Sequence, residues 1–235
     1  MFGPKELQWF YKKFDPRKLK VFSTAEVLKS FYTLLRTKPH PLPKHVIEQL
    51  NENLDQENNA MASFALRLYF FNIFSDTDYG LDFRKKNFSN VGNWSFKSDS
   101  FGYNFDEKFI SGVRNLYDVF YTGDPEKLDK PMIELGLIGK NWRKDEKKQI
   151  IKLFLNHFSS SESKAIKFKT THLVASFTRI FIFLASKKSK LPSDFAMLGV
   201  ALVCLYSTLD NVEEDTDVKS CYLIGRKVAL ENQTK

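Results

Sequence analysis

One stretch, residues 64–103, constrains the fold of this chain more than any other. It begins with an apolar run, residues 64–74, that leads directly into the acidic turn Asp76-Thr-Asp-Tyr-Gly80. An apolar run of this length predicts a buried helix, and Asp, Thr and Gly are residues that favour a turn over a continued helix. The chain is therefore expected to leave a buried helix through a short acidic loop.

A hairpin is predicted directly after this loop. Two short extended segments, 81–84 and 93–97, are joined by the turn-prone residues Ser89-Asn-Val-Gly92. Turn residues between two such segments are typical of a β-hairpin. Phe101-Gly102-Tyr103 then leads into a new helix.

The rest of the chain is predicted to be mainly helical. Its 235 residues are 43% hydrophobic, with 23 phenylalanines and only 10 glycines, which favours packed helices over an all-β fold. Apolar residues recur at helical spacing over several further segments. These predicted helices cover residues 4–14, 24–35, 44–54, 106–121, 145–158, 171–186, a long segment from Ser193, which is expected to be its cap, and 222–230. Four residues of that long helix are expected in the core, namely Phe195, Leu198, Leu202 and Leu205.

Charge and cysteine content indicate few partner classes. The formal net charge is +8, but 36 basic and 28 acidic residues are interspersed, so nucleic acid is not the expected partner. Cys204 and Cys221 have no metal-type spacing and are interpreted as reduced thiols. No segment is long and apolar enough to predict a membrane span. The basic first twenty residues fit an import segment, a membrane-surface helix or a helix packed on its own domain.

The order of loop, hairpin and Phe-Gly resembles the UbiB (AarF-type) atypical kinase family, which is tied to coenzyme Q biosynthesis. That family reads roughly F-F-H-x-D-P-H-P-G-N, then a hairpin, then D-F-G. Here Phe70-Phe71 fits the start, Asp76 the loop Asp and Gly80 the Gly, and Phe101-Gly102 fits the end of D-F-G. Kinases keep this order because the hairpin brings the catalytic loop and a metal-binding Asp together.

Two magnesium-binding positions of this pattern are changed. Leu81 stands in place of the metal-binding Asn, and Ser100 stands in place of the Asp of D-F-G. Leucine has no donor atom, and a neutral hydroxyl is a poor substitute for a carboxylate. Asp82 and Asp99 lie one position away, but a one-residue shift in an extended segment points a side chain to the opposite face. The resemblance therefore implies a degenerate site with no catalytic residue and no cofactor.

Other segments match the family in the same order. Lys29-Ser-Phe-Tyr32 occupies the position of its K-x-G-Q helix, with only Lys29 retained and Tyr32 in place of Gln. Later matches are Gly123-Asp-Pro125, Glu134-Leu-Gly-Leu137 and Leu191-Pro192 through Gly199, which resemble G-D-P, E-L-G-L and L-P-x-x-F-x-L-L-G.

The nucleotide-binding lobe of the family is missing. Only Asp55–Asn59 joins the helix predicted at 44–54 to the next one, and five residues cannot form a β-rich N-lobe. No glycine-rich phosphate loop is present either. The resemblance implies a mainly α fold, a degenerate kinase-like C-lobe with one short hairpin and no N-lobe. An N-terminal segment, 1–54, and the C-lobe segment, 60–235, are expected to pack as one domain.

The leading hypothesis for function is a catalytically inactive pseudokinase. The family's setting implies an accessory subunit of a mitochondrial complex on the matrix side of the inner membrane, such as a respiratory-chain complex, with protein partners and a peripheral lipid contact. A second hypothesis is a residual metal- and nucleotide-dependent ATPase or kinase linked to coenzyme Q or lipid metabolism, which would use Asp76, Asp78, Asp82 and Asp99. A third is a basic subunit of an organellar ribonucleoprotein.

A partner surface is predicted where the missing lobe would have covered the C-lobe. This region is rich in aromatic residues, which dominate interface energetics. The candidates are Tyr79, Phe83, Phe88, Trp94 and Tyr103. The alternative is that the N-terminal helices fold back over this face.

Overall fold

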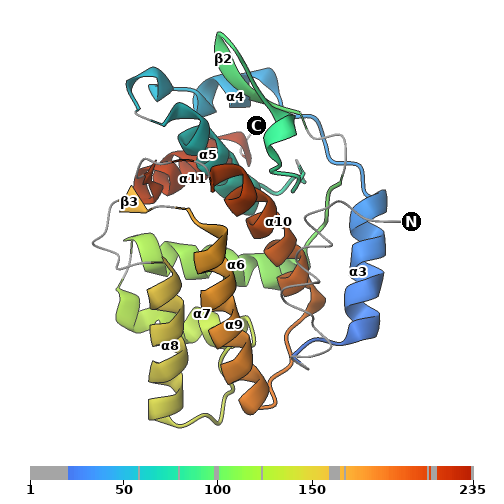
Figure 1. The fold of residues 1–235 in the computed structure, drawn as a ribbon, viewed down its shortest axis with the longest axis vertical. Coiled ribbons are helices and arrows are strands. Elements are labelled where there is room, and N and C mark those ends of the chain that lie inside the picture. The colour runs from blue at the N-terminus through green and yellow to red at the C-terminus, as the bar shows by residue number, and fades with distance from the viewer. Residues whose placement is uncertain are drawn as a thin grey trace. The chain divides into compact units, whose positions relative to one another are not determined.

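The computed structural model describes residues 21–57, 59–78, 80–97, 101–122, 124–158, 165–166, 168–210, 212 and 216–233 (Figure 1). These residues are mainly α-helical, as predicted. The helices are α3 (Thr24–Arg36), α4 (Lys44–Leu50), α5 (Ala60–Phe74), α6 (Glu107–Thr122), α7 (Asp129–Glu134), α8 (Lys144–Phe158), α9 (Thr170–Ser186), α10 (Ser193–Leu209) and α11 (Val218–Gln233). Three short 3-10 turns are η1 (Leu54–Gln56), η2 (Lys85–Asn87) and η3 (Pro125–Leu128). The helix predicted at 4–14 lies outside the described residues.

The predicted hairpin is present, but its first strand lies further along the chain. Strand β1 (Phe88–Val91) pairs antiparallel with β2 (Asn93–Phe96), and Gly92 turns between them with φ of +83°. Residues 81–84, predicted as the first strand, belong to no strand, and the N–H of Phe83 instead donates to the carbonyl of Leu81 at 3.0 Å, which turns the backbone there. A second two-stranded sheet, β3 (Ala165–Ile166) with β4 (Thr216–Asp217), was not predicted. Within the described ranges, each sheet has two strands.

Three further predictions need correction. Helix α4 ends at Leu50 rather than 54, since Asn51 is its C-cap and a 3-10 turn follows. The C-terminal helix is longer than predicted and runs over α11. Ser193 is the first residue within α10, and its hydroxyl accepts a hydrogen bond from Ser30 at 2.9 Å, so it is not the cap residue before the helix. Phe195, Leu198, Leu202 and Leu205 are buried, as predicted.

The chain forms two compact units. The first comprises residues up to Tyr32, residues 105–163 and residues 170–203. The second comprises residues 33–104, 164–169 and those from Cys204 onward. The linker between the predicted segments 1–54 and 60–235 lies within the second unit.

The second unit is organised around α5, which is buried on nearly all sides. A helix that is apolar all round must be covered by its neighbours, and α11 provides the largest part of that cover. Gly225 of α11 allows the close approach, because a Cβ there would lie 2.4 Å from the carbonyl oxygen of Arg67. Tyr222 packs edge-on against Phe70, with 5.4 Å between ring centroids.

A buried arginine fixes the linker of the second unit. Arg67 of α5 is 1% exposed and donates hydrogen bonds to the carbonyl oxygens of Leu50 and Glu52, at 3.0 and 2.8 Å. Its guanidinium also pairs with Glu57. These acceptors bind Nη1 and Nη2 and offset the cost of burying the charge, while Nε is buried without a hydrogen-bond partner. The short linker that follows η1 is thereby held against α5.

The first unit packs α8 beside α9 (Figure 1). At its core, Phe109 of α6 meets Phe195 of α10 edge-on, with 5.4 Å between ring centroids. The start of α6 is capped by Asp106, whose carboxylate accepts the N–H of Phe109 at 3.1 Å. Asp194 in turn accepts the N–H of Asp106 at 2.9 Å, which ties α10 to this cap.

Candidate functional site

The acidic loop, residues 75–83, is built from turn-forming side chains of the second unit. Ser75 ends α5, and its hydroxyl accepts the N–H of Thr77 at 3.2 Å. Asp78 accepts the N–H of Gly80 at 2.9 Å, and Gly80 has φ of +97°, which favours glycine. Asn72 of α5 donates to the carbonyl of Gly80 at 2.9 Å, so the loop folds back onto the helix that precedes it.

Two distant segments close on this loop. The N–H of His40 donates to the carbonyl of Asp78 at 2.8 Å, and the N–H of Gly102 donates to the carbonyl of Thr37 at 3.0 Å. Leu81 donates its N–H to the carbonyl of Phe101 at 3.4 Å. The structure therefore brings the acidic loop and Phe101-Gly102 together.

Asp78 is the half-buried acid of this cluster. Burial raises the pKa of its carboxyl, while the N–H groups of Gly80 and Tyr103 and the charge of His40 act in the opposite direction. Its Oδ2 is buried without a hydrogen-bond partner. A Cβ at position 102 would lie 2.5 Å from that oxygen, so the close approach requires glycine there. The sequence pattern singled out Asp76 as the loop acid, yet Asp76 is exposed and Asp78 makes these contacts.

Asp82 is fully buried and neutralised within the loop. Its two carboxylate oxygens accept from Nε and Nη2 of Arg84, each at 2.5 Å. The Arg84 guanidinium also lies 5.8 Å from the centroid of the Phe101 ring. This bidentate pair engages both oxygens of a carboxylate that is fully buried, so Asp82 is not presented to a metal ion at the surface of the loop.

The predicted metal alternative used Asp76, Asp78, Asp82 and Asp99, with Asp76, Asp82 and Asp99 as its proposed ligands. Asp82 is engaged by Arg84, Asp76 is exposed, and Asp99 lies outside the described residues, as does Ser100. In the part of the chain that the structure describes, no three His, Cys, Asp or Glu side chains are grouped as metal ligands.

Leu81, the residue in the metal-binding position of the kinase pattern, is buried at 4% exposure. Its side chain is therefore part of the core. Lys29 and Tyr32, which were compared with the Lys and Gln of the K-x-G-Q pattern, belong to α3 in the first unit, and both are exposed.

The aromatic residues predicted to form an exposed partner surface are largely covered. Phe83 is 0% exposed and Tyr103 is 8% exposed, so neither contributes to an open face, and this expectation was wrong for both. Phe88 and Trp94 are half-buried. Tyr79 lies outside the described residues.

The covered aromatics hold the hairpin against its own unit. Phe96 packs between Phe83 and Phe88, with centroid distances of 5.8 and 5.1 Å. Asn51 binds the backbone of Trp94 on both sides, accepting its N–H at 2.9 Å and donating to its carbonyl at 2.7 Å. The sequence predicts an aromatic-rich region here, but these aromatic side chains pack against one another within the unit.

A pair of histidines in the first unit was not predicted to meet. The rings of His157 and His172 stack, with 5.7 Å between centroids. His157 Nδ1 lies 2.7 Å from the hydroxyl of Ser176, which itself donates to the carbonyl of His172 at 2.7 Å. The Ser176 hydroxyl is also within 3.1 Å of the carbonyl of Leu173, so its contacts are those of a serine bonded to its own helix. Burial, followed by the charge of His172, lowers the pKa of His157 to about 3, so the ring is neutral.

The two cysteines are buried free thiols. Burial is the main cause that raises the pKa of Cys221 to about 12, so this thiol is unreactive at neutral pH.

An apolar pocket in the first unit is too small for a metabolite. Its lining includes Val113, Leu116, Phe154, Phe177 and Leu202. The cavity volume is about 30 Å³, comparable with the share of one water molecule in the liquid. Such a gap fits ordinary core packing between helices better than a binding site.

No helix within the described ranges is long and apolar enough to cross a membrane. The sequence matches neither a protein-family model nor the sequence of any curated protein. The fold and the geometry of the acidic loop are therefore the basis for a functional proposal.

Proposed function

We propose that this chain is a non-catalytic subunit that works through its surfaces, built on a helical scaffold like the C-lobe of UbiB-type kinases. Its setting is a membrane-associated assembly of the mitochondrial matrix side, such as a respiratory-chain complex. The resemblance supplies the scaffold and the compartment. The loss of catalysis is argued from the acidic loop.

This proposal rests on one observation, namely that the buried carboxylate of the acidic loop is paired with an arginine of the same loop. Kinase catalysis depends on carboxylate and amide oxygens that hold Mg²⁺ over the phosphates. Here Leu81 is in the core at the amide position, and both oxygens of Asp82 are taken by Arg84. Because Asp82 is paired inside the loop, it does not replace the metal ligand that is missing at Leu81.

Nucleotide binding tests the loss of catalysis. Titration calorimetry with Mg²⁺-ATP, repeated with Mn²⁺, should give no heat of binding, and the purified chain should not hydrolyse ATP. Asp76→Ala, in the loop, is compared with Asp55→Ala, an exposed acid of η1 outside it. ATP hydrolysis by the unmodified chain that is lost in Asp76→Ala and kept in Asp55→Ala would overturn the proposal in favour of a residual enzyme.

The hairpin is the proposed partner-contacting element. Val91 at its tip is 92% exposed, and half-buried Phe88 and Trp94 lie on its strands. Protein interfaces depend on aromatic and apolar anchors of this kind. The buried Phe83 provides the matched comparison, since it supports the same hairpin without reaching the surface.

Assembly and stability are to be measured separately in these variants. Val91→Ser and Trp94→Ser should lower the fraction of the chain that migrates in a high-mass complex on native gels of cell extract. Val91→Ser should do so with an unchanged melting temperature. Phe83→Ser should lower the melting temperature first. The hairpin would be excluded as a partner surface if both Val91→Ser and Trp94→Ser assembled fully. In that case Trp94→Ser would lose only stability.

A further inference from the structure

The positive charge of this chain is concentrated in one part of the first unit. We define the basic surface as residues 140–152 together with residues 187–190. It holds nine basic and two acidic residues, a net charge of +7 out of +8 for the whole chain. The expectation that basic and acidic residues are evenly interspersed therefore does not hold here.

Three lysines follow one exposed face of α8. Lys144, Lys148 and Lys152 are each exposed and are spaced four residues apart. Residues at this spacing have Cβ atoms about 5–6 Å apart on the same face of a helix, so the three form a line about 12 Å long. Like charges at this spacing destabilise an isolated helix, which means that stability alone does not favour them.

Another lysine occupies a backbone position that favours glycine. Lys188 follows the end of α9 with φ of +54°, in the left-handed region. Its N–H donates to Ala185 and that of Ser189 to Leu184, each at 3.0 Å, which is the bonding pattern of a helix end with glycine in this place. A non-glycine residue in this conformation carries a steric cost.

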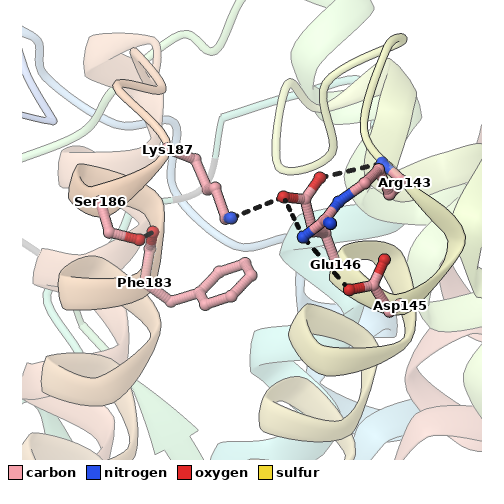
Figure 2. Close-up of polar contacts among 6 residues, drawn as sticks. All are labelled: Arg143, Asp145, Glu146, Phe183, Ser186 and Lys187. Carbon is pink, nitrogen blue, oxygen red and sulfur yellow. Dashed lines mark hydrogen bonds and ion pairs between the residues drawn. The ribbon is translucent and has the colours of Figure 1, made fainter.

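Both acids of the basic surface are paired, and one of them, Glu146, joins its two helices (Figure 2). Glu146 of α8 accepts from Lys187 of α9 at 2.7 Å and from the N–H of Arg143 at 2.9 Å. These contacts lower the pKa of Glu146 to about 2. Asp145 pairs with the Arg143 guanidinium at 3.3 Å. Lys187 also lies over the Phe183 ring, 5.6 Å from its centroid.

Six of the other lysines have no such partner. Within the described ranges, no carboxylate pairs with Lys140, Lys144, Lys147, Lys148, Lys152 or Lys188. The ion pairs thus hold α8 and α9 together, whereas these six ammonium groups face the solvent. An unpaired field of one sign attracts a polyanion.

We propose that the basic surface binds the phosphate backbone of a nucleic acid. Phosphate contacts from lysines give affinity and strong salt dependence but carry no sequence information, so the binding is sequence-independent. The site lies in the first unit, whereas the acidic loop lies in the second, and the inference does not depend on the proposed function.

Two other anionic partners fit the observations less well. Protein interfaces are depleted in lysine and rely on aromatic and arginine anchors, and this surface has eight lysines and one arginine. Firm membrane attachment needs a second, apolar signal besides a basic patch. The one tryptophan of the surface, Trp142, is half-buried and packs edge-on against Phe183 at 5.6 Å, so it is not free to insert.

Binding is to be measured by fluorescence anisotropy with the full chain. The probes are a single-stranded RNA 20-mer, an RNA duplex and a DNA duplex, each in two unrelated sequences, from 50 to 300 mM salt. With six unpaired lysines, the slope of log affinity against log salt for single-stranded RNA should approach about −4. The two sequences of each probe should bind alike. Comparison of the three probes shows whether the chain prefers RNA or DNA.

The critical variant is Lys144→Gln, Lys148→Gln, Lys152→Gln, which keeps helix-forming residues on α8. It should bind about tenfold or more weakly at 50 mM salt, with a slope smaller by about 2. The matched control, Lys85→Gln, Lys86→Gln, Lys219→Gln, removes the same net charge from exposed positions of the second unit and should bind as the unmodified chain does.

Lys188→Gly separates binding from stability. Relief of the left-handed conformation should raise the melting temperature by about 2–4 °C, while affinity for RNA falls. Equal losses in the critical and control variants would refute the proposal, because only net charge would matter. Selective binding to vesicles of 30% anionic lipid, with no nucleic acid retained at 100 mM salt, would refute it in favour of a membrane surface.

Discussion

The acidic loop and the basic surface show opposite uses of charge. In the acidic loop, the carboxylate of Asp82 is buried and paired with Arg84, and Asp78 is bound by backbone N–H groups. In the basic surface, Glu146 joins the ends of two helices, Asp145 pairs with the nearby Arg143, and six lysines have no acidic partner among the described residues. Charges that stabilise a fold are paired inside it, whereas unpaired charges on rigid helices are available to a partner.

The contacts that charged side chains make therefore say more about function than the order of motifs in the sequence does. The acidic loop has the order of a kinase site, but its charge is used internally. The basic surface has no motif, yet its charge is open to solvent. The following predictions test this contrast, from the largest expected effect to the smallest.

Acidification should destabilise the chain through His157, which lies on the buried side of α8 and is neutral in the folded state. The pKa of this histidine is lowered from 6.5 to about 3 in the folded chain, so protons bind the unfolded chain more strongly between these values. The free energy of unfolding should be unaffected by this group above pH 6.5 and should fall by up to about 5 kcal/mol as the pH drops toward 3. Urea titrations from pH 7 to 4 measure this. The dependence should become shallower in His157→Gln, and an equal slope in both proteins would contradict the assignment.

Removal of Asp82 should break the buried ion pair of the acidic loop. Asp82→Ala leaves the Arg84 guanidinium without its bidentate partner at a site where Arg84 is only 17% exposed. Loss of one member of such a pair typically lowers the free energy of unfolding by about 3–5 kcal/mol. Lys148→Ala, which removes an unpaired charge of the basic surface, should change it by less than about 0.5 kcal/mol. Similar values for both variants would remove the contrast between the two regions.

Restoring the kinase pattern should cost stability and give no activity. Leu81→Asn introduces an amide at a position that is 4% exposed and should lower the free energy of unfolding by about 2–4 kcal/mol. Combined with Ser100→Asp, it should still show no ATP turnover in a coupled assay, because no phosphate-binding loop is present in the sequence. Measurable turnover would show that the loop needs only these two ligands.

Asp78→Asn should have the smallest effect and the opposite sign. Burial raises the pKa of Asp78, so its charged form is disfavoured in the folded chain, and its contribution to stability falls as the pH rises through that pKa. The amide oxygen of asparagine can still accept the backbone N–H groups. Thermal unfolding at pH 7 should therefore show a melting temperature equal to or above that of the unmodified chain. A marked decrease would show that the carboxylate charge itself is needed.

The helical part of the fold was predictable because its signal is local. Apolar spacing located α6, α8 and α9 to within a residue or two of their ends. The first strand of the hairpin was misplaced because Leu81, Asp82 and Phe83 are all buried, so they lack the alternation of inner and outer faces on which strand prediction relies.

The contacts of the candidate sites depend on residues far apart in the sequence. The partner of Asp82 is only two residues away, but its burial comes from the packing around it, and the stacking of His157 on His172 joins two helices. No spacing rule predicts such meetings. The charge concentration was visible in the run from Lys140 to Lys152, whereas the exposure and the lack of acidic partners became clear only from the fold.

The contact between α5 and α11 also bears on how the chain is made. A helix that is apolar on nearly all sides is synthesised early, but the helix that covers it begins at Val218 and reaches the ribosome exit only after most of the chain has been translated. Until then, α5 presents its apolar surface to its surroundings, and contacts of such long sequence separation form slowly. The docking of α11 onto α5 is therefore expected to be a late step in folding.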